Sequence, residues 1–226
     1  MDTSKQIIRD LKNKVGFNAE VDFMNMRKGV PVVFKGSIKD FTSDGIIFEV
    51  SPPDSICLEW DGQTMILHNF FLSAMQARVR SFDIASGLVE LADLTYVDRG
   101  FGHRSMVRVE PEEPFEMTID TGKYQISGVV MDVSLNGFGM QVEKFESGTV
   151  SEGDPITIKT NIVNKNIEIP GKILKIFTDG DHHRFALSFE YDAPGHAAVA
   201  RYITQRRAEI RQEITDAYQQ ALGADA

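Results

Sequence analysis

Short runs of alternating apolar and polar residues, separated by turn residues, fill most of the chain from about residue 30 onward. A period of two places every second side chain on one face of a β-strand. The predicted strands are 30–34, 45–50, 55–59, 64–67, 77–82 and 88–91, followed by 115–119, 124–131, 137–142, 155–162, 167–176 and 184–190. No helical run interrupts either series, so the pattern predicts antiparallel barrels or sandwiches.

The two series of strands resemble each other. The segment 36–50 aligns with the segment 128–142, and in both an Asp, a Ser or Thr, an Asp or Asn, and a Gly follow in the same order and spacing. Apolar alternation continues after the glycine in each segment. This register predicts an internal repeat, with two copies of one six-stranded β-barrel in tandem.

A helix is predicted at each end of the chain. Ile7, Ile8 and Leu11 recur at helical spacing, and Gly16 ends the short N-terminal helix. A C-terminal helix of about 25 residues is expected from its period. Its apolar stripe comprises Val199, Ile203, Ile210, Ile214, Ala217 and Leu222, and its predicted solvated side comprises Arg201, Arg206, Arg207 and Arg211. Packing of this stripe on the barrel is the default expectation. The stripe is longer than one barrel needs, so a homodimer contact through this helix is the alternative.

The stretch 97–105 breaks the strand pattern with two glycines and mixed charge, and it is the predicted linker. The expected division is an N-terminal barrel over 1–96 and a C-terminal domain over 106–226 that includes the long helix. The fold class is therefore mainly β.

Composition limits the classes of function. The 226 residues carry a net charge of −9, which argues against binding long nucleic acid, because such binding needs a basic face. No apolar run approaches the ~18 residues of a membrane span. No secretory signal is evident, and the single cysteine, Cys57, suits a reducing compartment. A cytoplasmic protein is expected.

Residues 99–108 form a local basic cluster without an acid: Arg99, His103, Arg104 and Arg108. A guanidinium can pair bidentately with phosphate or with guanine O6 and N7, and it can stack on a purine. Two arginines four residues apart could therefore grip a small anionic nucleotide. The alternative is that they are ordinary solvated charges.

The polar turn Asp132-Val-Ser134-Leu-Asn136-Gly137 carries complementary chemistry. A carboxylate at Asp132 can accept hydrogen bonds from guanine N1–H and N2–H. Ser134 adds a small donor and acceptor, and Gly137 permits positive φ or a close backbone approach. The alternative is plain hairpin chemistry, which favours the same residue types.

The arginine pair and the turn together resemble the PilZ family, bacterial cytoplasmic receptors for cyclic di-GMP. The family motif is matched by Arg104 and Arg108, and then by Asp132, Ser134 and Gly137. Residues 1–96 resemble the N-terminal barrel of the two-domain, flagellar-brake-like members. The resemblance implies a receptor whose domains rearrange on binding and that signals to a protein partner in motility, exopolysaccharide or pili control.

Some features of this resemblance leave alternatives open. His103 stands where many members carry another arginine, so one ligand or a stacked ligand pair could bind, with Arg99, His103 and Asn136 as further candidate contacts. The first copy lacks the arginine pair and is expected not to bind the same ligand. A PilZ-like adaptor that binds protein but no nucleotide remains the second hypothesis.

No enzyme, cofactor or metal site is expected. The pair His182-His183 could suggest metal ligation, but neighbouring side chains in a strand point to opposite faces. Cys57 lies in an apolar run and is more consistent with a core residue than with a nucleophile. No glycine-rich phosphate loop or nucleophile elbow is present.

Overall fold

The computed structural model describes residues 3–71, 73–97, 106–143, 145–146, 148–179, 182–190 and 193–224. The chain divides into two compact units. The first unit is Met1–Arg27, Pro31–Ser105 and Ile210–Ala226, and the second is Lys28–Val30 and Met106–Glu209. Most of the expected linker 97–105 lies outside the described residues, so the predicted domain boundaries stay a prediction.

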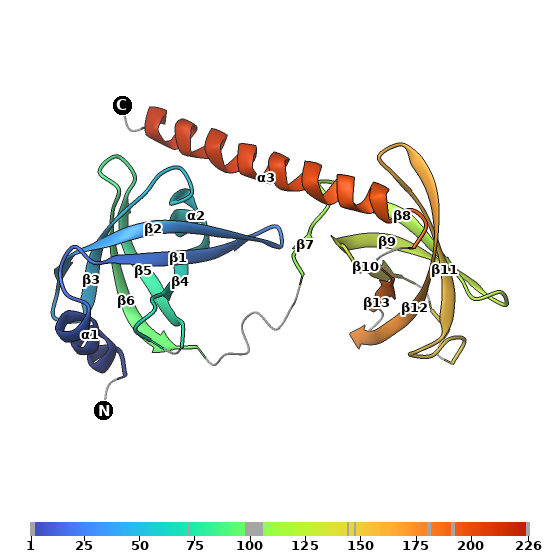
Figure 1. The fold of residues 1–226 in the computed structure, drawn as a ribbon, viewed down its shortest axis with the longest axis horizontal. Coiled ribbons are helices and arrows are strands. Elements are labelled where there is room, and N and C mark those ends of the chain that lie inside the picture. The colour runs from blue at the N-terminus through green and yellow to red at the C-terminus, as the bar shows by residue number, and fades with distance from the viewer. Residues whose placement is uncertain are drawn as a thin grey trace. The chain divides into compact units, whose positions relative to one another are not determined.

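The first unit is a closed antiparallel barrel of six strands (Figure 1). Its strands are β1 (Glu20–Arg27), β2 (Val30–Phe41), β3 (Gly45–Val50), β4 (Gln63–Leu67), β5 (Met75–Asp83) and β6 (Leu88–Tyr96), in the spatial order β1-β2-β3-β6-β5-β4. Phe23, Phe34 and Phe48 lie in its core, with the ring centroids of Phe34 and Phe48 at 5.4 and 5.2 Å from that of Phe23. Burial of such rings against one another is a major source of stability in a small barrel.

Strand β1 is not among the predicted strands. Val21, Phe23 and Asn25 alternate inward along it. The inward Asn25 obscures the apolar pattern, but it is satisfied by Asp61, by the Gln63 carbonyl and by Thr64 Oγ1. A buried polar side chain with such partners costs little, and sequence periodicity misses it.

Two helices belong to the first barrel. The predicted N-terminal helix is α1 (Thr3–Lys14), which packs against β6 and buries Ile7, Ile8 and Leu11. The predicted strand 55–59 is wrong, because this segment is the short helix α2 (Ile56–Asp61). Ile56, Cys57 and Leu58 are buried one after another, and Gly62 ends the helix in the left-handed region at φ 62°. An apolar run without alternation fits a buried helical turn as well as a strand.

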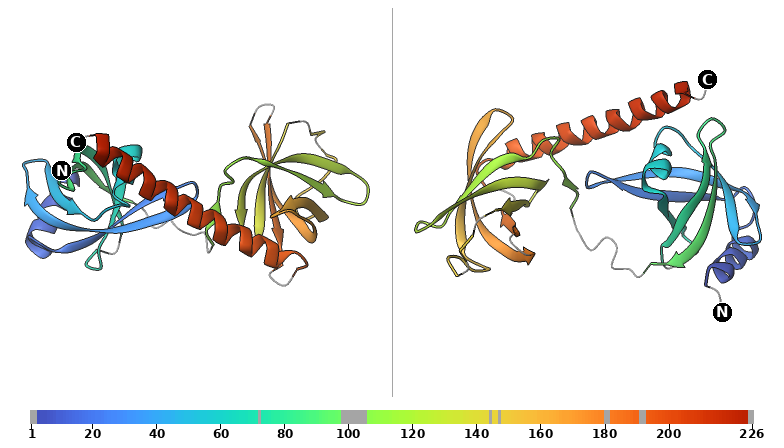
Figure 2. Two further views of the ribbon diagram at one scale, coloured as in Figure 1. Left: turned by 90° about the horizontal axis from the view of Figure 1, so that it is seen from above. Right: turned by 180° about the vertical axis from the view of Figure 1, so that it is seen from behind.

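The second unit is also a closed six-stranded antiparallel barrel, to which a short strand, β7 (Arg108–Val109), is added beside β9 (Figure 2). The barrel strands are β8 (Phe115–Asp120), β9 (Gln125–Ser134), β10 (Gly137–Val142), β11 (Pro155–Ile162), β12 (Lys165–Asp179) and β13 (His182–Phe189). Pairing of β9 with β10 closes it.

Strand register bears out the predicted repeat. In the first barrel Asp40 lies opposite Ile47, and the pairing shifts by one residue between Ile38 and Asp40. In the second barrel Asp132 lies opposite Gly139, with the same shift beside it. The bulge falls at equivalent positions of two barrels with equivalent strand order, so the two tandem barrels of the prediction are confirmed.

The long C-terminal helix is α3 (His196–Ala224). Val199 and Ile203 are buried within the second unit, and Ile210, Ile214 and Tyr218 within the first. The expectation that Arg206 is solvated is wrong. Its side chain is fully buried, Nε donates to the Glu110 carbonyl at 3.0 Å, and Nη1 contacts Glu209 Oε2 at 3.0 Å. None of the described helices is both long and apolar enough to cross a membrane.

Candidate functional site

Arg108 is held beside the polar turn by a short strand. In β7 it lies directly opposite Ser134, and its neighbour Val109 lies opposite Val133. Val109 is fully buried, and it anchors the strand on the barrel. The Arg108 side chain remains 33% exposed, so its guanidinium is fixed at one end and accessible at the other.

Asp132 is the centre of the charged site. Its side chain is only 8% exposed, and Arg108 Nη1 lies 3.1 Å from Oδ1. Arg184, on β13, places Nη2 2.5 Å from Oδ2. Two arginines therefore share one nearly buried carboxylate, and the desolvation of Asp132 is offset by charge-assisted hydrogen bonds on both oxygens.

Arg184 is not among the predicted site residues. Sequence pattern assigns its segment to the closing strand of the barrel and says nothing of a role for the arginine. The one signal in the sequence is an arginine at an exposed position of that strand. The register of β13 against β10 places Arg184 opposite Gln141, and only this pairing brings it near the turn.

Ser134 and Gly137 build the turn itself. Ser134 is buried, and its Oγ lies 3.1 Å from Asn136 Oδ1 and 3.0 Å from the Gly137 carbonyl oxygen. Gly137 is not among the residues with positive φ. A Cβ there would overlap the Leu187 carbonyl oxygen, so glycine is needed for the close approach of β10 to β13.

Asn136 is the exposed tip of this turn. Its backbone carbonyl accepts from the Phe189 amide at 3.0 Å. It also lines a groove of about 910 Å³ together with Gly171, Ser188 and Phe189. The remaining predicted site residues, Arg99, His103 and Arg104, lie outside the described residues.

The other residues with candidate chemistry are the pair His182-His183 and Cys57. Within the described parts of the chain, no group of three or more His, Cys, Asp or Glu side chains could hold a metal ion. His183 Nδ1 lies 3.2 Å from Thr178 Oγ1. Burial raises the pKa of the Cys57 thiol to about 12, and a protonated thiol is a poor nucleophile.

Comparison with known proteins places the arginine pair and the polar turn in one family. Residues 103–205 match the family model described as the PilZ domain. This part of the chain matches the PilZ family. The matched region includes β7, the Asp132 turn and the first part of α3.

Several solved structures resemble the chain weakly over most of its length. Escherichia coli YcgR in complex with c-di-GMP is 13% identical with a TM-score of 0.42, covering 94% of this chain and 92% of its own. The Bacillus subtilis inhibitor of motility MotI/DgrA is 11% identical with a TM-score of 0.40, covering 85% and 97%. MrkH of K. pneumonia in its apo state is 9% identical with a TM-score of 0.41, covering 92% and 95%. No curated protein matches the sequence. The likeness to the PilZ family rests on the match of residues 103–205.

Proposed function

We propose that the PilZ domain of this chain is a receptor for cyclic di-GMP. The ion pair between Arg108 and Asp132 carries the proposal, because it joins two parts of the motif that lie 24 residues apart in sequence. A guanidinium suits the phosphates and the O6 and N7 edge of guanine. A carboxylate suits the opposite edge, which presents N1–H and N2–H.

Ligand binding would exchange partners at this ion pair. Arg108 is one-third exposed and can turn its guanidinium from Asp132 Oδ1 to the ligand. Asp132 would then accept from the guanine base in place of Arg108. Ser134 already uses its hydroxyl inside the turn, so its main contribution would be to hold Asp132 and Gly137 in place.

We further propose that binding changes the arrangement of the two units and so alters a surface for a protein partner. The support is in the sequence, since Arg104 lies within the predicted linker 97–105 and Arg108 follows it closely. Order–disorder and hinge switches of this kind are a common route from a small ligand to a protein output. Small-angle X-ray scattering with and without ligand tests this step, and identical profiles at saturation would remove it.

Isothermal titration with cyclic di-GMP tests the receptor itself. Arg104→Ala and Arg108→Ala should each weaken binding by about tenfold to a hundredfold, as expected for the loss of charge-assisted hydrogen bonds. Thr42→Ala changes the equivalent turn of the first barrel and should leave binding intact. Absence of heat with folded wild-type protein at micromolar concentration would refute the proposal. The titration also reports whether one ligand or two are bound.

The competing function is a protein-binding adaptor that needs no nucleotide. One observation favours it, namely that Asp132 and Ser134 are buried and already have hydrogen-bond partners. A thermal-shift series with cyclic di-GMP, cyclic di-AMP and cyclic GMP-AMP separates the two. Stabilisation by cyclic di-GMP supports the receptor, whereas no shift with any dinucleotide supports the adaptor.

A further inference from the structure

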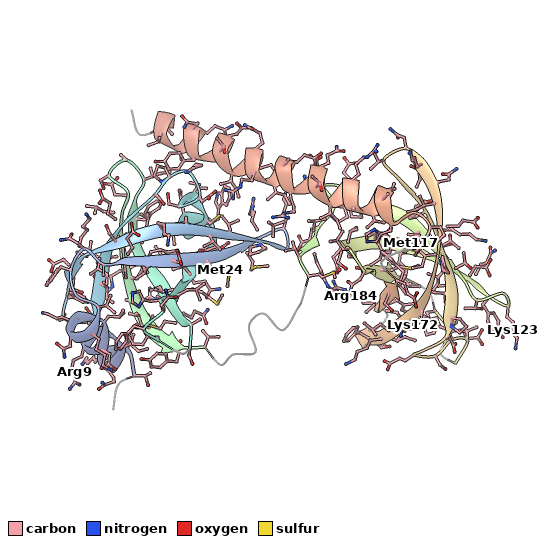
Figure 3. All side chains as sticks on the ribbon, in the orientation of Figure 1. Arg9, Met24, Met117, Lys123, Lys172 and Arg184 are labelled. Carbon is pink, nitrogen blue, oxygen red and sulfur yellow. The ribbon has the colours of Figure 1, made fainter. Side chains whose placement is uncertain are left out.

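Arg184 gives Asp132 a second cationic partner that the arginine pair does not supply. It comes from β13, 52 residues further along the chain, and lies in the second barrel (Figure 3). Its side chain is 57% exposed, whereas that of Asp132 is 8% exposed. Arg184 therefore approaches the carboxylate from the solvent side and fixes one oxygen, Oδ2, while Oδ1 faces Arg108.

A recess over β10 makes this contact possible. Asp132 on β9 lies opposite Gly139 on β10, and Gly139 in turn lies opposite Ala186 on β13. A Cβ at Gly139 would overlap Asp132 Oδ2, so the carboxylate occupies the space that any other side chain would fill. The side chain of Asp132 thus reaches across β10 toward Arg184, which is two residues from Ala186.

The first barrel has the same strand order and the same bulge, but it lacks the recess. Asp40, at the position of Asp132, lies opposite Ile47 where the second barrel has Gly139. Leu88 lies opposite Glu49 in the first barrel, and Arg184 lies opposite Gln141 at the equivalent place in the second. The first barrel therefore has a leucine where the second has Arg184. Asp40 is exposed, and its Oδ1 accepts from the amide of the next residue, Phe41, at 2.8 Å. Of the two barrels, the one that carries the Arg108 motif therefore has both the recess and the additional arginine.

We propose that Arg184 is a positioning residue of the cyclic di-GMP site and acts through Asp132. This inference rests on the proposed function. A carboxylate has about four acceptor positions, and the two arginines occupy two of them. When Arg108 turns to the ligand, Arg184 keeps Oδ2 in place and holds the carboxylate oriented toward the guanine edge. Without Arg184, the nearly buried Asp132 carboxylate would have neither arginine as a partner once Arg108 has turned to the ligand.

This role predicts an effect on base recognition. Guanine offers N1–H and N2–H donors, whereas adenine has no donor at either position, so a fixed carboxylate favours guanine. Loss of Arg184 should therefore lower the preference for cyclic di-GMP over cyclic di-AMP as well as the affinity. A purely structural role would lower the stability of the barrel without changing this preference.

The test is a double-mutant cycle measured by titration with cyclic di-GMP. Arg184→Met should weaken binding by about tenfold, and Arg184→Lys, which keeps the charge, should lose less. In an Asp132→Asn background, Arg184→Met should cost less than about twofold, because its target carboxylate is already gone. Lys172→Met is the matched control, since it removes an exposed cation from neighbouring β12 and should leave affinity within about twofold.

Each outcome separates the two proposals. No binding by the wild type refutes the receptor itself. Binding by the wild type with an unchanged Arg184→Met variant overturns the role of Arg184. If Arg184→Met weakens binding as much in the Asp132→Asn background as in the wild type, the role is also overturned. Arg184 would then act on the ligand directly or on the fold. If Arg184→Met does not fold, Arg184→Lys in both backgrounds gives the same comparison.

Discussion

At the scale of single residues, Gly139 decides where the Asp132 carboxylate can lie. Glycines are usually explained by positive φ, but neither Gly139 nor Gly137 adopts it. Both are required by close approach, Gly139 to a side chain and Gly137 to a backbone carbonyl. An alanine at either position adds a single carbon atom where no space exists.

We expect Gly139→Ala to weaken cyclic di-GMP binding by about tenfold or more, because the new Cβ would displace Asp132 from its recess. The measurement is calorimetric titration, with circular dichroism to show that the barrel folds. Gly223→Ala is the control, since a Cβ at Gly223 meets nothing within 4 Å. Wild-type affinity in a folded Gly139→Ala variant would show that the position of the carboxylate is unimportant.

At the scale of elements, the first part of α3 and the segment after β7 are tied together by Arg206. Its buried guanidinium donates to the Glu110 carbonyl, two residues after Arg108. The side chain therefore helps to fix the strand that carries the proposed ligand contact. Its hydrogen bonds to the Glu110 carbonyl and to Glu209 explain how a buried arginine is tolerated on the packed side of an otherwise amphipathic helix.

Arg206→Ala should lower the free energy of unfolding by about 2–4 kcal/mol, because it leaves a cavity and an unpaired carbonyl. Urea unfolding measured by circular dichroism checks this value. Trp60 is the only tryptophan and lies in α2 of the first unit, so its fluorescence should report a smaller change. Arg207→Ala, at an exposed position on the same helix, is the control and should change stability by less than about 0.5 kcal/mol.

Helix α2 gives a second prediction at this scale. Burial, together with the nearby charges of Asp61 and Asp54, raises the pKa of Cys57 to about 12. The thiol should therefore not react with dithiobis(nitrobenzoate) near neutral pH while the protein is folded. One thiol should react after unfolding in urea. Equal rates in the folded and unfolded protein would contradict the burial of α2.

At the scale of the whole molecule, surface carboxylates in both units, exposed Asp44 and partly exposed Asp120, link stability to acid pH. The Arg80 guanidinium lowers the pKa of Asp44, and the Gly122 amide and the Lys159 ammonium lower the pKa of Asp120. A carboxyl with a lowered folded pKa stabilises the fold above its unfolded pKa of about 3.9. That stabilisation is lost as the pH falls through the folded pKa.

We therefore expect the thermal midpoint to fall below about pH 4, measured by circular dichroism. Asp120→Asn keeps an oxygen for the Gly122 amide but removes the charge, so this variant should show a slightly smaller fall. The difference should be small, because ion pairs at the protein surface contribute little. A larger fall in the Asp120→Asn variant would contradict the direction of the pKa shift.

Much of this protein could be predicted from local sequence pattern. Alternation and turn residues act over a few neighbours, and they determined the two barrels, the repeat and both terminal helices. The same local patterns failed at α2, where a buried turn of helix lacks alternation, and at β1, where Asn25 faces inward. The motif likewise identified Arg108, Asp132, Ser134 and Gly137 as one group, and its arginine Arg104 stays a prediction.

What only the tertiary structure decided is which distant residues share a site. Strand neighbours are not encoded in any local pattern, so the contact of Arg184 with Asp132 across 52 residues followed only from the register of β9, β10 and β13. The burial of Arg206 and the recess at Gly139 depend on the same packing. The sequence by itself determined that the second barrel carries a charged turn and an arginine pair. The fold decided how the carboxylate of that turn is held, because a buried charge is placed by its partners.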